Sequence, residues 1–275
     1  LGPLCKDVRD AALMMNVISG RDPRDATSAD VPVPDYSTAL GQELEGLRGG
    51  IARELLYDEG VDPEVRQTIK KAIEQLATLG VEILEVNLPH SEYSEACYNI
   101  LGAAEASSNL ARFDGVRYGY RTENQVNDIH ELFAKSRTES LGQQVKLRLM
   151  RGTYTLSAEN YNTFYLKAAK VRTLIKHDFE VAFEQCDFLI SSTSPTLPFK
   201  VGEKIDDAAV LRADARCAAS ANLAGIPAIS VPCGFVKGLP VGMQLMGKPF
   251  DESLLLQVAY AYEQSTHWHK QRAEL

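Results

Sequence analysis

The sequence lacks several features that would assign a cellular location or a familiar fold at once. No apolar run approaches the ~18–20 residues that a membrane-spanning helix needs, and the start, Leu1–Lys6, is not a secretory signal peptide. We therefore expect a cytoplasmic protein, or an organellar one in a eukaryote, that makes no membrane contact. Because the chain has no initiator Met and opens on an apolar Leu-Gly-Pro, we also expect a truncated chain.

Most sequence motifs of catalysis are missing as well. There is no phosphate-binding P-loop, no G-x-G-x-x-G, no G-x-S-x-G nucleophile turn and no H-E-x-x-H zinc motif. Two imidazoles at His267 and His269 are too few for a metal site, and no metal is predicted. The cysteines are odd in number, form no C-x-x-C pair and indicate buried thiols in a reducing compartment: Cys5, Cys97, Cys186, Cys217 and Cys233.

The composition is that of an ordinary globular protein. The 275 residues are 45% apolar and 24% charged, which is enough for one large α/β domain. A net charge of -8 argues against a chain that clamps a nucleic-acid backbone by itself. The basic stretch Lys167–Arg172 is interpreted as a solvated helix face.

One segment predicts a strand, a helix and a second strand in succession. Residues 48–53 form a short strand, and Asp62 and Pro63 then suit the N-cap and first position of a helix. Residues 81–88 alternate as a strand. Short links between these elements predict a parallel crossover, and hence a parallel sheet covered by helices.

The remaining periodicity predicts further helices and strands. Expected helices span residues 7–20, 91–110, 127–150, 208–224 and 253–265, and a long helix begins at an N-cap at Ser157 with a buried face that includes Tyr161 and Phe164. Expected strands span residues 187–190, 228–231 and 240–246. The loop 191–198 follows a buried strand, so its hydroxyls either bind a substrate or satisfy the backbone of a turn; the turn is favoured.

Three segments carry a resemblance to a known family. Gly20–Ser28 after an acidic-capped helix, Glu105–Tyr120, and Asn222–Gly234 followed by Gly238–Gly247 resemble segments of the amidase signature family. Within it, they are most similar to the A subunit of the tRNA-dependent amidotransferases, which serve glutamyl-tRNA(Gln) or aspartyl-tRNA(Asn). The likeness runs through almost the whole chain in order.

The resemblance implies a fold and a location for the catalytic groups. It implies an α/β amidase-signature fold with a mixed, largely parallel central sheet covered by helices on both faces. Residues 1–275 would form the C-terminal portion of a single amidase domain. The family hydrolyses amides with a Lys and two serines, which would precede Leu1, so no catalytic residue is assigned in this chain.

The resemblance also implies substrate contacts in this portion. The family's glutamine pocket uses a Tyr, an Arg and an Asp, and Arg148 falls at the Arg position, where a guanidinium suits a carboxylate. Tyr98 is the nearest candidate for the Tyr, although the position itself holds Asn99. Asp214 lies one residue before the expected position, which holds Ala215.

The predicted function is that of the glutaminase subunit. It would release ammonia from glutamine or asparagine for partner subunits: a tRNA-binding kinase/transamidase that uses ATP and Mg²⁺, and a small subunit. Contact with tRNA would be indirect, and this chain would hold no cofactor. Two alternatives stay open: a stand-alone amidase-signature hydrolase of another small amide, and a non-catalytic amidase-like module.

Overall fold

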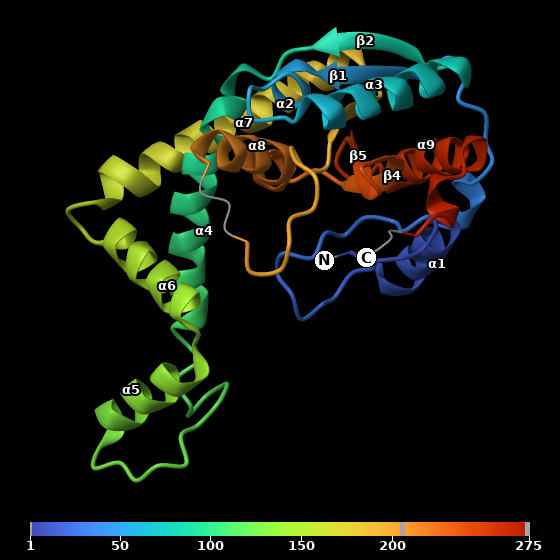
Figure 1. Cartoon of the computed structure of the whole chain (residues 1–275). Helices are drawn as coiled ribbons and strands as arrows, with labels where there is room; N and C mark the ends of the chain where they lie inside the picture. Colours follow the sequence, from blue (N-terminus) through green and yellow to red (C-terminus); the bar gives the residue numbers. More distant parts are fainter. Residues whose placement is uncertain (1, 204–206, 273–275) are drawn as a thin grey trace. The chain divides into compact units, whose positions relative to one another are not determined.

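The computed structural model describes residues 2–203 and 207–272 (Figure 1). The chain divides into two compact units. We call the first, Leu1–Glu92 with Ile175–Leu275, the sheet unit, and the second, Tyr93–Leu174, the helical unit. Within the described ranges, no helix is both long enough and apolar enough to cross a membrane.

The sheet unit contains one mixed sheet, as the family resemblance implies. Among the described residues its strands lie in the order β2-β1-β3-β5-β4. β1 pairs in parallel with β2 and β3, whereas β5 is antiparallel to β3 and β4. The strands are β1 (Arg48–Ala52), β2 (Glu82–Val86), β3 (Phe188–Ser192), β4 (Ala228–Val236) and β5 (Leu239–Gly247).

A two-residue turn makes the last strand pair antiparallel. Val236 pairs with Leu239, so only Lys237 and Gly238 connect β4 to β5. Both residues have positive φ angles, 52° and 78°. Two consecutive residues of that kind form the tight hairpin turn whose twist matches the flanking strands.

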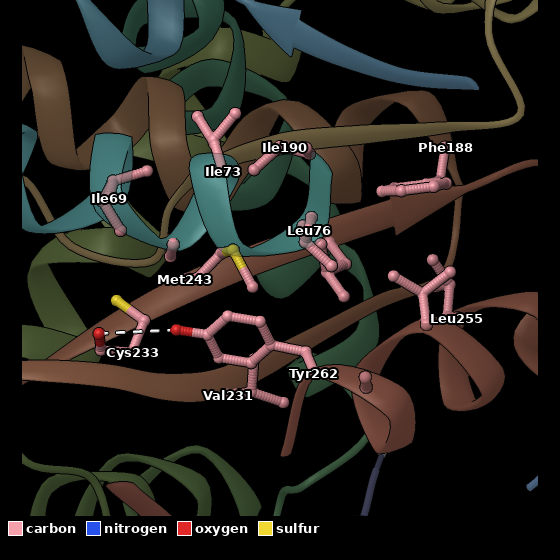
Figure 2. Packing of buried hydrophobic residues seen from close by; sticks show 14 of the residues in the cluster. Ile69, Ile73, Leu76, Phe188, Ile190, Val231, Cys233, Met243, Leu255 and Tyr262 are labelled. Carbon is pink, nitrogen blue, oxygen red and sulfur yellow. Dashed lines mark hydrogen bonds between the residues drawn. The ribbon is translucent and has the colours of Figure 1, made fainter. Parts of the chain in front are cut away.

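Helices cover both faces of the sheet. Phe188 and Ile190 of β3 lie in the main hydrophobic cluster with buried residues of α3 (Pro63–Thr78) and α9 (Glu252–Ser265), several of which Figure 2 shows. On the opposite face, the Gln244 side chain of β5 donates a 2.8 Å hydrogen bond to a carbonyl oxygen in α8 (Ala208–Ala224). The predicted two-sided cover is thus observed.

Helix α3 forms where the sequence predicts it. The Asp62 carboxylate accepts hydrogen bonds from the Glu64 and Val65 amides at 2.7 and 3.4 Å, and Pro63 occupies the first turn. Its apolar stripe faces the cluster and includes Leu76, which is fully buried.

Shorter elements complete the sheet unit. They are α1 (Val8–Ile18), η1 (Tyr36–Ala39), α2 (Arg53–Leu56), η2 (Pro89–Tyr93) and η4 (Trp268–Lys270). Helix α1, expected over residues 7–20, ends at Ile18 with Ser19 as its C-cap. Its first amide donates to the buried Glu263 carboxylate at 2.9 Å.

The helical unit contains α4 (Ser94–Leu110), α5 (Ile129–Ser140), α6 (Gln143–Leu156), the π-helical turn η3 (Tyr161–Tyr165) and the start of α7 (Leu166–Gln185). Helix α6 packs along α4 (Figure 1). A Cβ atom on Gly152 of α6 would lie 2.0 Å from the Ala103 carbonyl oxygen of α4. Only glycine therefore permits the two helices to approach this closely.

Three helix predictions in this unit are wrong. Two helices stand where a single helix over residues 127–150 is expected, because Leu141 and Gly142, the N-cap of α6, are both extended. Ser157 ends α6 instead of starting the next helix. Tyr161 and Phe164 are exposed, at 40% and 36%, because they belong to the π-helical turn that precedes α7.

Candidate functional site

Tyr98 and Arg148 lie together in the helical unit. Tyr98 projects from α4 and Arg148 from α6, and the guanidinium carbon lies 5.7 Å from the centre of the phenol ring. Both side chains are exposed. A guanidinium over an aromatic face is held in orientation without its hydrogen-bond donors being used. Its donors can therefore still receive an anion.

A surface hollow of about 340 Å³ lies next to this pair. Arg148 lines it with a second arginine, Arg151, one turn further along α6. Asn99, at the position where the resemblance leads one to expect a Tyr, also lines the hollow. The complete lining is Asn99, Ala103, Gln144, Val145, Leu147, Arg148 and Arg151.

Asp214 lies in the sheet unit, on α8. It lines a pocket of about 410 Å³ that also includes residues 193–199 and parts of β4 and β5. The residue as a whole is exposed, but the surrounding protein partly desolvates its carboxyl group and raises the pKa of Asp214. Ala215 beside it is half-buried. The roles of Arg148, Tyr98 and Asp214 in substrate binding stay predictions.

The hydroxyl-rich segment after β3 divides into two parts. Ser191 and Ser192 extend the strand and are completely buried, so they are not loop residues as expected. Thr193 and Ser194 line the 410 Å³ pocket, and the Thr193 hydroxyl lies 2.6 Å from the hydroxyl of Ser230 on β4. The hydroxyl-bearing residues that line the pocket are therefore Thr193, Ser194, Thr196 and Ser230.

Helix α8 is anchored beneath the pocket by polar contacts. Arg216 forms an ion pair with Asp58 in which both side chains are largely buried. The Cys217 thiol donates to the Leu55 carbonyl oxygen at 3.6 Å and lies 3.4 Å from the Ser192 hydroxyl. Burial raises the pKa of Cys217 to about 11, so this thiol stays protonated and is a packing group rather than a nucleophile.

The histidines are not grouped for metal binding. His90 bonds Asp178: its ring Nδ1 lies 2.8 Å from one carboxylate oxygen, and its amide donates to the other at 2.7 Å. Among the described residues, no three His, Cys, Asp or Glu side chains are placed to hold a metal ion.

The amino-acid sequence matches a protein-family model. The family model described as Amidase matches residues 1–256. The chain belongs to the amidase family.

Two bacterial relatives illustrate the similarity within it. The glutamyl-tRNA(Gln) amidotransferase A subunit from Thermodesulfovibrio yellowstonii is 53% identical over 273 residues, covering 99% of this chain and 56% of the relative. The corresponding protein from Heliobacterium modesticaldum is 50% identical over all of this chain and 56% of its own length. The chain thus spans a little more than half the length of these relatives.

Solved structures give the same picture. The crystal structure of the glutamyl-tRNA(Gln) amidotransferase A subunit from Thermotoga maritima has a TM-score of 0.74 at 35% identity, covering 96% of this chain and 52% of that one. A bacterial aryl acylamidase of the amidase signature family has a TM-score of 0.74 at 21% identity, covering 98% of this chain and 53% of its own, which shows the shared fold.

Proposed function

We propose that the protein to which this chain belongs is the amidase subunit of a tRNA-dependent amidotransferase. It would release ammonia from glutamine, or asparagine, for the amidation of mischarged glutamyl-tRNA(Gln) or aspartyl-tRNA(Asn). The observation that carries this proposal is the 53% identity, over 99% of the chain, to the A subunit of such an enzyme.

The proposed reaction divides between this chain and the rest of the protein. In this family one serine attacks the amide, and a Lys and a second serine move the protons. All three residues are proposed to lie outside these 275 residues. In the described portion, the exposed guanidinium of Arg148 beside Tyr98 suits the carboxylate of the amide donor. Asp214 is proposed as a further substrate contact, near the hydroxyls of the 410 Å³ pocket.

The proposed partners are the other amidotransferase subunits. A tRNA-binding kinase/transamidase subunit would use ATP and Mg²⁺ to activate the mischarged aminoacyl-tRNA, and a small subunit would complete a cytoplasmic complex. The excess of 37 acidic over 29 basic side chains supports this division, because a chain with that charge is poorly suited to hold the tRNA alone.

Ammonia release by the full-length protein tests this proposal. With glutamine as donor, we expect release that rises when the partner subunits and mischarged tRNA are added. A protein that hydrolyses simple amides but neither glutamine nor asparagine would contradict the proposal. As a companion test, a fluorophosphonate probe should leave the 275-residue chain unlabelled, whereas stoichiometric labelling would place the nucleophile within it.

One observation favours a second candidate, a stand-alone hydrolase of another small amide. Asn99 and Ala215 stand where the resemblance leads one to expect the Tyr and Asp of a glutamine pocket. Substitution at both positions is compatible with a different donor, and the same ammonia assay with a panel of amides separates the two functions.

A further inference from the structure

The hollow between α4 and α6 has an unusual charge for a chain with a net charge of -8. Two guanidinium groups, Arg148 and Arg151, line it, and the side-chain amides of Asn99 and Gln144 add neutral donors. None of its lining residues is acidic. Such a set of side chains attracts an anion and offers it several hydrogen-bond donors.

The two arginines are held close together without a protein counter-charge. Arg148 and Arg151 are three positions apart on α6, so their side chains lie on one face of the helix. Like charges at this spacing destabilise a helix slightly. Among the residues that the structure describes, neither arginine forms an ion pair with a carboxylate. A bound anion would remove this repulsion.

The start of α6 adds to the positive potential. Gly142 occupies the N-cap, no side chain caps the helix and its first turn has no acidic residue. The free amides of a first helical turn carry partial positive charge. Gln144 and Val145, which line the hollow, belong to this turn. The helix end and the two guanidinium groups therefore act on the same space.

We propose that Arg151 joins Arg148 in one anion-binding subsite and is a determinant of substrate specificity. This inference rests on the proposed amidase function and deepens it: the substrate is a small amide with a carboxylate group, and two guanidinium groups hold that carboxylate. A planar guanidinium donates two parallel hydrogen bonds to a carboxylate. The volume of about 340 Å³ suits a small molecule.

Arg151→Gln in the full-length protein is the direct test. The variant loses charged hydrogen bonds to the carboxylate, so we expect the KM for glutamine to rise about tenfold or more, with kcat changed less than about twofold. Arg151→Lys keeps the positive charge but loses the planar guanidinium that donates two parallel hydrogen bonds. This variant should therefore give an intermediate KM.

Arg112→Gln is the matched control. Arg112 is exposed in the same unit and does not line the hollow. The control loses the same charge, so it should leave the KM for glutamine within about twofold. An equal change in KM for Arg151→Gln and Arg112→Gln would reduce the effect to general electrostatics and overturn the proposal.

A binding measurement separates this inference from the proposed function. Glutarate, a dicarboxylate with no amide to hydrolyse, should bind the full-length protein in isothermal titration, and Arg151→Gln should weaken that binding about tenfold or more. This result supports the subsite even if glutamine releases no ammonia. Absence of glutarate binding to the unmodified protein would overturn it. Inorganic phosphate that binds more tightly than glutarate, and depends on Arg151, would overturn the assignment to a carboxylate.

Discussion

The two units are packed in different ways. All of the largest fully buried side chains among the described residues lie in the sheet unit, including Tyr262, Phe179 and Phe188. In the helical unit most of the buried apolar side chains are small, such as Ala103 and Ala104, and many large ones are exposed. The sheet unit is therefore stabilised by bulk in its core, and the helical unit by close approach of its helices.

The units also differ in charge and in what they present to solvent. Basic side chains outnumber acidic ones in the helical unit, although acidic ones predominate in the whole chain. Between the start of α6 and the end of the unit, Glu159 is the single acidic residue. The same stretch holds six basic residues: Lys146, Arg148, Arg151, Lys167, Lys170 and Arg172. The comparison teaches that the unit with the smaller buried side chains is also the more basic one.

Truncation of the sheet-unit core should have the largest effect on stability. Leu76 is fully buried in the main cluster, so Leu76→Ala should lower the free energy of unfolding by about 2–5 kcal/mol. Met150 on α6, which is 70% exposed, provides the contrast. Met150→Ala should change the free energy of unfolding by less than about 0.5 kcal/mol. If Leu76→Ala and Met150→Ala shift the denaturant midpoint equally, the difference in core packing between the two units would not be supported.

An added methyl group should affect the helical unit most where α4 and α6 meet. Gly152→Ala places a Cβ atom against the Ala103 carbonyl oxygen and should destabilise the unit by about 1–3 kcal/mol. Faster hydrogen exchange of the α4 and α6 amides would report this. Gly102→Ala is the control: its nearest neighbour is the Tyr98 ring at 3.9 Å, so it should be neutral or stabilise by up to about 1 kcal/mol.

Loss of a helix cap should have a smaller effect than loss of core volume. Asp62→Ala removes the acceptor of the Glu64 and Val65 amides and should cost about 1 kcal/mol of unfolding free energy. Asp62→Asn keeps an acceptor oxygen and should retain most of the stability. If thermal unfolding shows that Asp62→Asn loses as much stability as Asp62→Ala, the acceptor oxygen is not what stabilises the start of α3.

The smallest expected effect is a pH-dependent turn in the helical unit. Backbone amides of Arg117 and Val116 donate to the Asp114 carboxylate and, with the Arg117 guanidinium, lower the pKa of Asp114 from 3.8 to about 2. The folded turn binds fewer protons than the open one, so its stabilisation is complete above pH 3.8 and is lost as the pH falls through about 2.

An NMR titration of the Val116 and Arg117 amides measures this transition. Asp114→Asn should remove the pH dependence in that range. Amide shifts that titrate with a midpoint near 3.8 would show that the carboxylate is not held by the turn.

Much of the fold could be predicted because its signals are local. Asp62 and Pro63 mark the start of α3 in the sequence, and α8 spans the predicted residues 208–224. Other features of the fold have no clear local signal. In the sequence, Gly142 is compatible with a continuous helix, yet the helix is interrupted there. The need for glycine at position 152 is evident only from the structure, where Ala103 of α4 lies beside it.

The candidate site could be predicted only in part. The resemblance identifies Arg148, and its helical spacing to Arg151 is visible in the sequence, but nothing local shows that the two face a hollow with Asn99. Asp214 and Thr193 line one pocket because α8 and the end of β3 converge in the folded unit. Such convergence has no signature in the sequence.

The crystal structure of the full-length protein with bound glutamine or glutarate is the most direct test of the account. The account predicts a carboxylate group about 3 Å from the guanidinium nitrogens of both Arg148 and Arg151, over the edge of Tyr98. A ligand whose carboxylate contacts neither arginine, with Arg151 turned to solvent, would contradict it.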